Sequence, residues 1–513
     1  MAKTPPRSML SCGTATTFVL SNEGDLWVTG LNHQLQLGLS NACQRNRIQP
    51  LSWEYFELVH STNNKIPAFR AVYTCGSTTF ATTVENSLFS WGNNNHGQLG
   101  QGDANDVCLP ARVCFLYSDV SKDMCLLPKI WQVSCGNNHT LILSVDGRIL
   151  SCGENTCGQL GRGDMDFTTT CNRFVVVYPL HGQHTAASKN VRSIASGAYV
   201  CAMILEDESL WLWGNHVYGQ VPGAPRPGGG FLPRKIPFKI EDIVDDYDNE
   251  DPDHERRPFL VESISISIEH CACITTDKRV WTWGMNSFGK LGNGTKNGNS
   301  CRPASVMSAS QLQSMSMPVE ICCGGHHTLI RTSIGSLWAA GAHKLGIGID
   351  GGHESSLCRF QRVALPRCAY VDGGGNMQVL AMAAGKTHSA IITTGGHVMT
   401  CGKMKASIPV TPRPLEEGEV AAHSAFGGLG YFQGLAQQGH VSTFQKVYKL
   451  QGKVSFFADF SACTLAKVHI MLLGAHFDKT GSVASTTPST DRMFMNLVPD
   501  DVLDVIIRQI IVV

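Results

Sequence analysis

The sequence has few charged residues and no excess of either sign. Charged side chains make up 16% of its 513 residues, and 41 basic residues balance 41 acidic ones. A chain of this balance has no overall positive field that would hold DNA, RNA or anionic lipid without a specific site. We therefore expect neither direct nucleic-acid binding nor attachment to a membrane.

Long apolar segments are also missing. No uninterrupted apolar run reaches the ~18–20 residues that a membrane-spanning helix needs. The first residues, MAKTPPRSMLSCG, lack the charged start and the apolar core of a secretory signal. We expect a soluble, intracellular protein, and we favour the cytoplasm over the nucleus.

Cysteine is abundant, but the spacing of metal and redox motifs is absent. None of the 20 cysteines forms a C-x-x-C pair, so zinc-ribbon and thioredoxin-like sites have no support, and disulfides or another metal site are the alternative to reduced thiols. Six cysteines instead stand directly before recurring glycines, and these are Cys12, Cys75, Cys135, Cys152, Cys323 and Cys401. Cysteines that follow a repeat are most simply small, buried, reduced hydrophobic residues.

The signatures of catalysis are absent as well. No Ser-His-Asp order, nucleophile elbow, pair of catalytic carboxylates or kinase signature stands out. The glycine-rich turns, such as GENTCGQLGRGD from Gly153, precede no helix pattern and no Lys-Ser/Thr pair, which disfavours a phosphate cradle. We predict a protein that is not an enzyme, with no catalytic residues, no metal site and no cofactor.

What the sequence does contain is a repeat of glycine pairs. Two anchor positions lie 17 residues apart in each unit, or 16 in the second unit. The first anchors are Gly13, Gly76, Gly136, Gly197, Ser267, Gly324, Gly385 and Phe457, and the second are Gly30, Gly92, Gly153, Gly214, Gly284, Gly341, Gly402 and Gly474. One such unit cannot bury its apolar face alone, so the units must stack on their neighbours.

The stretch between two anchors is typical of a β-hairpin. In the third unit a strand ends at Gly136, a second runs over 140–145, and Asp146-Gly147 provides a tight turn into a third strand. Two adjacent positions before the second anchor are apolar in every unit. Because adjacent residues point to opposite faces of a strand, this strand should be covered on both faces, as in sheets stacked around an axis.

The repeat resembles that of a known family. The pattern C-G-x-x-H-T followed by W-G-x-N-x-x-G-Q-L-G is similar to the regulator of chromosome condensation repeat. Its carriers are Cys135-Gly136, His139-Thr140, Trp91-Gly92, Asn94, Gly97-Gln98-Leu99-Gly100 and Trp283-Gly284. The resemblance covers roughly residues 9 to 475 and implies an all-β fold, a seven-bladed β-propeller with four-stranded blades.

The eighth unit departs from this pattern. Residues 455–476 have lost the first glycine, the Trp-Gly pair and the Gly-Gln-Leu-Gly turn. This unit is expected either to form an extra or irregular blade or to supply the outer strand of the first blade, which would close the ring and protect its sheet edges. We favour seven blades.

Two domains are predicted from these features. Residues 1–475 form the propeller, with an acidic insertion at 221–258 and a Gly/Ala-rich insertion at 403–450. Residues 476–513 form a linker and a short amphipathic helix. The stretch from Val498 to Leu503 faintly resembles the opening of an F-box but is too short for that domain, and a truncated gene model is the alternative.

Four histidines share one position in the repeat, three residues after the first anchor. They are His139, His270, His327 and His388. A metal site would require three or four of them to converge within about 2 Å of one ion. A ring of repeats instead places them apart, one per unit, so we predict histidines that hydrogen-bond to the backbone near the neighbouring unit.

The acidic insertion is the strongest functional feature. Nine carboxylates fall within fifteen residues, and these are Glu241, Asp242, Asp245, Asp246, Asp248, Glu250, Asp251, Asp253 and Glu255. Such a run cannot bury apolar area and should be a solvated loop. It is either a tolerated surface insertion or a docking segment for the basic surface of a partner protein, with salt-sensitive binding.

These observations favour a protein-interaction scaffold that binds partner proteins through its loops and one face of the ring. The family resemblance implies an alternative, a guanine nucleotide exchange factor for a Ran-like small GTPase, which needs no catalytic side chain. A second alternative, a ubiquitin-ligase adaptor, depends on the F-box-like tail alone. The oligomeric state is left open.

Overall fold

A computed structural model gives the positions of most of the repeat region. The structure describes residues 8–39, 45–51, 68–113, 115–117, 124–163, 171–178, 190–223, 232–236, 259–306, 316–342, 356–365, 378–394, 396–402 and 441–449. The chain divides into two compact units, Met1–Val454 and Ser455–Val513, and every described residue belongs to the first. The predicted eighth unit, the C-terminal tail and all nine carboxylates of the acidic insertion lie outside the described residues.

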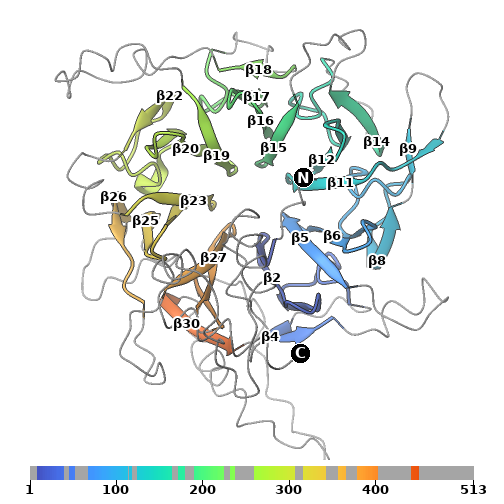
Figure 1. Cartoon of the computed structure of the whole chain (residues 1–513), viewed down its shortest axis with the longest axis horizontal. Helices are drawn as coiled ribbons and strands as arrows, with labels where there is room; N and C mark the ends of the chain where they lie inside the picture. The colour runs from blue at the N-terminus through green and yellow to red at the C-terminus, as the bar shows by residue number, and fades with distance from the viewer. Residues whose placement is uncertain are drawn as a thin grey trace, which may run out of the picture. The chain divides into compact units, whose positions relative to one another are not determined.

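Seven sheets follow one another along the chain and surround a common axis, so the predicted seven-bladed all-β propeller is confirmed (Figure 1). Blades 1 and 2 contain β1 (Leu10–Cys12), β2 (Thr16–Leu20), β3 (Leu26–Gly30), β4 (Arg45–Pro50), β5 (Phe69–Cys75), β6 (Thr78–Thr83), β7 (Leu88–Gly92) and β8 (Val107–Val113). Blade 3 contains β9 (Phe115–Tyr117), β10 (Met124–Leu126), β11 (Ile130–Cys135), β12 (His139–Ser144), β13 (Ile149–Gly153) and β14 (Cys171–Tyr178).

Blades 4 to 7 repeat the four-stranded pattern. Blades 4 and 5 contain β15 (Val191–Ser196), β16 (Val200–Leu205), β17 (Leu210–Gly214), β18 (Arg234–Lys235), β19 (Val261–Ile266), β20 (His270–Thr275), β21 (Val280–Gly284) and β22 (Ser300–Ser305). Blades 6 and 7 contain β23 (Pro318–Cys323), β24 (His327–Thr332), β25 (Leu337–Ala342), β26 (Ser356–Arg362), β27 (Val379–Ala384), β28 (His388–Thr393), β29 (His397–Gly402) and β30 (Val441–Lys449).

The only helical element among the described residues is one 3-10 turn, η3 (Ser287–Gly289). None of the described elements is a helix long and apolar enough to cross a membrane. Blade 3 alone departs from four strands, because β9 and β10 extend its outer edge through a parallel pairing of Leu116 with Phe174.

The local sequence explains the hairpins. Gly147 has a φ of 83° at the turn between β12 and β13, a backbone conformation that glycine adopts at little cost. The strands then pair in register, with His139 opposite Gly153 and Leu143 opposite Ile149. In other blades Asn86, Glu208 and Lys278 take positive φ at the same turn, so the conformation is kept even without glycine.

Apolar residues cover both faces of the sheets, as the sequence indicated. Every residue of β7, β13, β21 and β29 is buried. The buried apolar residues form seven separate clusters, and each cluster joins one blade to the next. The blades therefore have no shared centre, and each sheet is stabilised by its two neighbours.

Within the described ranges, the ring closes between blades 7 and 1 by side-chain packing, and no strand of one blade pairs into the other. Leu10, Cys12 and Val19 of blade 1 pack against Ala390 and Ile392 of blade 7. Blade 1 has its own outer strand, β4, paired with β3. The expectation that part of 455–476 completes blade 1 is therefore wrong, because β4 already occupies that place.

Candidate functional site

Both anchors of every blade lie at the same edge of the ring, which we call the anchor face. In blade 3, β11 ends one residue before Gly136 and β13 ends at Gly153, so the loops after both glycines emerge on this side. The opposite side, the hairpin face, carries turns such as Asp146-Gly147. The repeat thus places the loops after the two anchors on the anchor face and the hairpin turns on the hairpin face.

The Gly-Gln-Leu-Gly turn of the anchor face is held by two amide side chains. Asn94 Oδ1 accepts the N–H of Leu99 at 2.9 Å, and Gln98 Oε1 accepts the N–H of His96 at 2.9 Å. Equivalent bonds recur in other blades, from Leu37 to Asn32, Leu160 to Asn155, Gln34 to Gln36, Cys157 to Gln159 and Tyr218 to Gln220. The amides replace water for backbone groups that the buried turn would leave unpaired.

The same turn also binds the next blade through one carbonyl oxygen. The Gln159 carbonyl accepts the indole N–H of Trp213 at 3.0 Å and the thiol of Cys201 at 3.3 Å. The carbonyl of Gln36 likewise accepts the indole of Trp91 and the hydroxyl of Thr79. The tryptophans and glutamines of the repeat are thus occupied in joining blades.

The four repeated histidines are fully buried and lie at four different blade junctions. Their Nε2 atoms contact one side chain each in the following blade: Cys201 at 3.0 Å from His139, Thr328 at 2.8 Å from His270, Ser389 at 2.6 Å from His327 and Thr17 at 3.1 Å from His388. We expected backbone partners, but only His388 also contacts a carbonyl, that of Thr16. The structure does not bring the histidines together.

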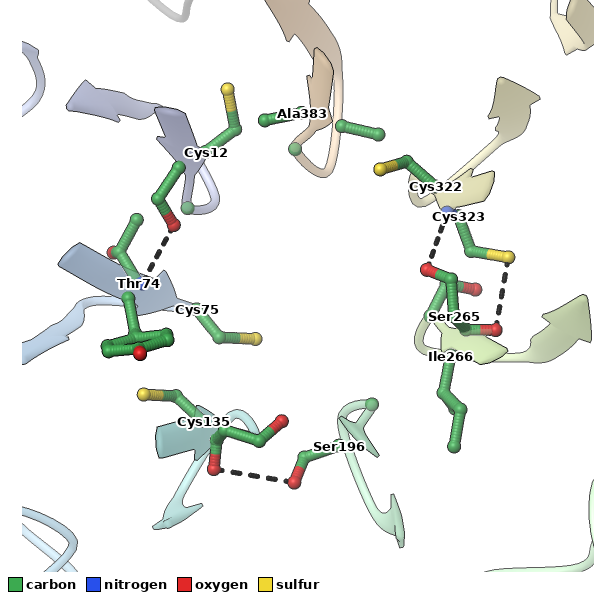
Figure 2. Close-up of a pocket in the computed structure, with 18 of the residues that line it drawn as sticks. Cys12, Thr74, Cys75, Cys135, Ser196, Ser265, Ile266, Cys322, Cys323 and Ala383 are labelled. Carbon is green, nitrogen blue, oxygen red and sulfur yellow. Dashed lines mark hydrogen bonds between the residues drawn. The ribbon is translucent and has the colours of Figure 1, made fainter. Parts of the chain in front are cut away.

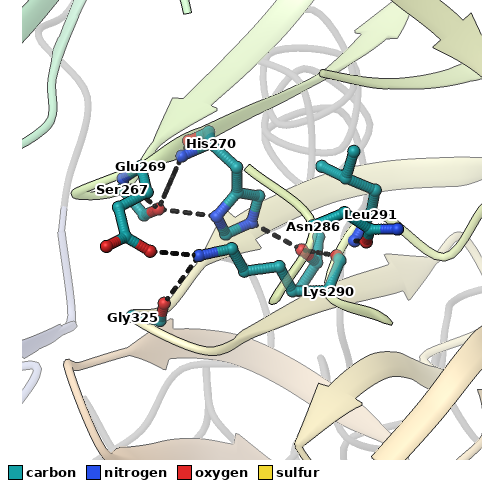
Figure 3. A network of polar contacts seen from close by, with 8 residues as sticks. Ser267, Glu269, His270, Asn286, Lys290, Leu291 and Gly325 are labelled. Carbon is teal, nitrogen blue, oxygen red and sulfur yellow. Dashed lines mark hydrogen bonds and ion pairs between the residues drawn. The ribbon is translucent and has the colours of Figure 1, made fainter. Parts of the chain in front are cut away.

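Blade 5 shows a continuous relay of hydrogen bonds across its junction with blade 6 (Figure 3). Thr328 donates its hydroxyl to the Lys290 carbonyl at 2.8 Å, so it must accept from His270 Nε2–H. His270 Nδ1 is then an acceptor, and the Ser267 hydroxyl, 2.6 Å away, donates to it. Blade 5 has serine at its first anchor, and this serine satisfies a nitrogen that has no partner in His139, His327 and His388.

Replacing Thr328 with Val tests this relay. The change keeps the shape but leaves both His270 Nε2 and the Lys290 carbonyl unpaired, so we expect a loss of about 2–4 kcal/mol in the free energy of unfolding. Thr140→Val is the matched control, because Thr140 donates to the Gln98 carbonyl at 2.9 Å and no histidine contacts it from blade 2. Urea unfolding should show a clearly smaller loss for Thr140→Val, and equal losses would contradict the role of His270.

Lys290 is the departure of blade 5 from the repeated glutamine. Its side chain is fully buried, and its ammonium group lies 2.6 Å from Glu269 Oε2 and 3.4 Å from the Gly325 carbonyl of blade 6 (Figure 3). Burial lowers the pKa of Lys290, and the Glu269 carboxylate opposes that change. A buried ammonium group is tolerated only with such a partner.

Phe288 stands two residues before Lys290 and is also unusual. It has a φ of 64° and a ψ of 14°, and 45% of it is exposed. Its ring lies against the imidazole of His326 in blade 6, with centroids 5.3 Å apart in an edge-on arrangement. An exposed aromatic residue in a strained backbone conformation marks a candidate functional position.

The innermost strands of all seven blades surround a central cavity of about 430 Å³ (Figure 2). Its walls carry several thiols, and burial raises the pKa of Cys12 and Cys323 to about 12 and that of Cys75 to about 11. Thiols with such pKa values stay protonated at neutral pH and are poor nucleophiles. No group of three His, Cys, Asp or Glu side chains within the described ranges could hold a metal ion.

The described residues that flank 237–258, Ile236 and Val261, lie on the hairpin face. Ile236 donates its N–H to the Leu210 carbonyl at 2.9 Å, and Val261 donates to the Glu208 carbonyl at 2.8 Å. Both contacts flank the turn between β16 and β17. The neighbours of the acidic run, Ile236 and Val261, thus lie on the opposite face of the ring from the Phe288–Lys290 cluster.

Sequence reasoning missed the cluster around Lys290. The repeated glycines, tryptophans and histidines drew attention because they recur, and all of them are structural in their contacts. The sequence feature that could have located this cluster is a departure from the repeat, because Lys290 occupies the position of Gln98, Gln159 and Gln220 in other blades.

Family models support the resemblance stated above. The model described as the regulator of chromosome condensation (RCC1) repeat matches residues 85–143 and 277–330, and a second model of the same description matches 132–159 and 261–290. The human X-linked retinitis pigmentosa GTPase regulator is 28% identical over 304 residues, which is 52% of this chain and 28% of that protein. The chain thus spans less than a third of that relative.

Solved structures share the fold. Human WBSCR16 superposes with a TM-score of 0.57 at 22% identity, over 75% of this chain and 86% of that one. Prp20p from Saccharomyces cerevisiae gives a TM-score of 0.54 at 17% identity, over 74% and 80% of the two chains. Its structure is described together with its binding properties to Gsp1p and histones.

Proposed function

This chain is a β-propeller built from RCC1-type repeats, and from that premise we propose that it is a scaffold that binds partner proteins through its loops and one face of the ring. One observation carries the proposal: the repeated Trp, Gln and His side chains are buried at blade junctions. The residues that recur hold the ring together, so specific recognition falls to the side chains that differ between blades. A rigid ring presents such side chains at little ordering cost.

The acidic insertion is one proposed docking element. Its eight leading carboxylates are Glu241, Asp242, Asp245, Asp246, Asp248, Glu250, Asp251 and Asp253. They would meet a basic partner surface in a contact that weakens with salt. The support is their density in the sequence, together with anchoring of the neighbouring residues Ile236 and Val261 on the hairpin face.

A second candidate function is guanine nucleotide exchange on a Ran-like small GTPase. It is favoured by the fold shared with Prp20p, whose structure is described with binding to Gsp1p, and by the relative that is named a GTPase regulator. Such an activity displaces nucleotide and magnesium from the GTPase and needs no catalytic side chain on the propeller. A ubiquitin-ligase adaptor role remains a prediction from the tail, which lies outside the described residues.

One experiment separates these functions. Purified chain is mixed with a panel of small GTPases loaded with a fluorescent guanine nucleotide, and in parallel it is used as bait for affinity purification at low and high salt. We expect stable protein complexes and no acceleration of nucleotide release. Acceleration at substoichiometric chain would establish exchange, and the absence of both complexes and acceleration would contradict the scaffold.

Deleting 241–255 tests the acidic segment in the same capture assay. The partner fraction that elutes at higher salt should fall, while thermal unfolding of the ring should be unchanged because the flanking strands are kept. If the chain captures partners equally well with and without the segment, the segment is not a docking element. The scaffold function would not be contradicted.

A further inference from the structure

The turn after the second anchor has one conformation in four blades and another in blade 5. In blades 1 to 4 the glutamine accepts the N–H of the residue two positions earlier, at 2.7–2.9 Å. Lysine has no acceptor atom, so Lys290 cannot make this bond. Its ammonium group binds Glu269 and the Gly325 carbonyl instead.

The residue that loses this acceptor is Phe288. It takes a left-handed φ of 64°, whereas the residues at its position in the other four turns, Gln34, His96, Cys157 and Tyr218, have no positive φ. A left-handed conformation costs a residue with a side chain roughly 1–2 kcal/mol. The substitution of lysine for glutamine thus coincides with an aromatic ring that is half exposed on the anchor face and supported from below by His326.

Three basic residues lie beside the turn that carries Phe288 or beside its neighbour His326. The Lys296 carbonyl accepts the N–H of Gly289, which places Lys296 directly beside the turn. Arg359 pairs with Asn293 across a β-bridge. Lys386 follows Gly385, whose carbonyl accepts the N–H of Gly325, the residue before His326, at 3.2 Å. Lys296, Arg359 and Lys386 are exposed, and the Glu269 carboxylate of this cluster is bound to Lys290.

We propose that Phe288 and its basic rim of Lys296, Arg359 and Lys386 form a docking surface for an acidic protein segment that carries an apolar or aromatic side chain among its carboxylates. The inference rests on the scaffold function and names one surface and one chemistry for it. The apolar side chain of the partner packs on Phe288 as a central contact, and the rim attracts the flanking carboxylates. Lys290 is a positioning residue that sets the turn and touches no partner.

The test measures fluorescence anisotropy with a labelled peptide of sequence EDIVDDYDNEDPDHE, which is residues 241–255 of this chain and has the required chemistry. We expect binding to the full chain that weakens with salt. Phe288→Ala should weaken it about tenfold, as for a central interface contact. Lys290→Gln should weaken it to a similar extent while keeping Phe288, because glutamine restores the acceptor of the other four turns.

Two controls separate this surface from general charge attraction. Val217→Ala removes an exposed apolar side chain, 70% exposed, from the equivalent turn of blade 4 and should leave binding unchanged. A peptide with Ile243, Val244 and Tyr247 replaced by Ser keeps every carboxylate and should bind about tenfold more weakly. The proposal is overturned if the peptide does not bind, or if binding depends on Lys386 but not on Phe288 and Lys290.

Further arms identify the source of the ligand. One variant replaces the nine carboxylates of 241–255 by the matching amides, Asp by Asn and Glu by Gln. If the parent chain self-associates and this variant is monomeric, the occupant is a second copy of this chain. Tighter binding of a short DNA duplex with the same dependence on Phe288 would overturn the protein-segment assignment. Affinity purification with the Phe288→Ala variant separates this proposal from the scaffold function. If the variant captures the same partners as the parent chain, the Phe288 surface is not the docking site, and the scaffold function is unaffected.

Discussion

Lowering the pH from 7 to 5 is expected to unfold the ring. Burial holds the pKa of His139 and His327 at about 3 and that of His388 at about 4, and burial beside Lys290 lowers the pKa of His270 as well. An unfolded chain has histidine pKa values near 6.5. Below that pH the unfolded chain gains protons that the folded ring cannot accept, so stability is full above about pH 6.5 and falls as the pH drops toward the folded values.

The expected size of this effect is large. At pH 5 the three histidines with pKa values of about 3 to 4 each contribute a loss of about 2 kcal/mol, or about 6 kcal/mol together, and His270 adds a loss of the same sign. This is comparable to the whole stability of many domains. Carboxylates do not contribute in this window, because their ordinary pKa values lie near 4. The four histidines lie at four of the seven blade junctions, so this loss of stability does not arise at a single junction.

Urea unfolding at a series of pH values between 7 and 5 measures the effect. The free energy of unfolding should fall with a slope of at least about three protons below about pH 6. His139→Gln supplies the control, since it removes one titrating group and should reduce that slope by about one proton. A flat profile across this range would show that the four imidazoles are not the neutral, buried groups described above.

Replacing Gly153 with Ala is expected to cost more than 3 kcal/mol of stability, on the order of a severe core substitution. Gly153 has a φ of 106°, and a Cβ atom there would lie 2.3 Å from the carbonyl oxygen of Asn138. That oxygen cannot move away, because it accepts the N–H of Glu154 at 2.8 Å and belongs to the loop that leads into His139. At Gly153 an added side chain therefore meets two costs, the left-handed backbone conformation and the overlap of its Cβ atom with the Asn138 carbonyl oxygen.

Gly147→Ala separates the two contributions. Gly147 has a φ of 83°, but the atom nearest to an added Cβ is Asn190 Oδ1 at 3.6 Å, an ordinary contact. This variant should lose only about 1 kcal/mol, the cost of the left-handed backbone alone. Thermal and urea unfolding of both variants give the comparison, and similar losses would mean that the close approach at the second anchor is unimportant.

Much of the fold followed from the sequence because its signals are local. The Asp146-Gly147 turn and the paired apolar positions before each second anchor required only short-range pattern, and the strands were found where they indicated. The spacing of the anchors gave eight units, and the family resemblance gave the seven blades that the structure shows. The closure of the ring did not follow, because the sequence showed no separate outer strand for blade 1, whereas β4 supplies one from residues 45–50.

The candidate surface could not be reached in the same way. The loss of a hydrogen-bond acceptor at Lys290 is readable, but its effect on Phe288 depends on which backbone N–H the glutamine of other blades binds. The basic rim also joins residues from blades 5, 6 and 7, which are separated by up to about ninety positions in the chain. Contacts between residues so far apart in the chain depend on how neighbouring blades pack, and the repeat pattern does not specify this packing.

The closure between blades 7 and 1 has an evolutionary consequence. In the part of the chain that the structure describes, each sheet comes from one stretch of sequence, and blades 7 and 1 exchange no strand. Duplicating or deleting one stretch of about sixty residues in the gene would therefore leave every remaining sheet whole.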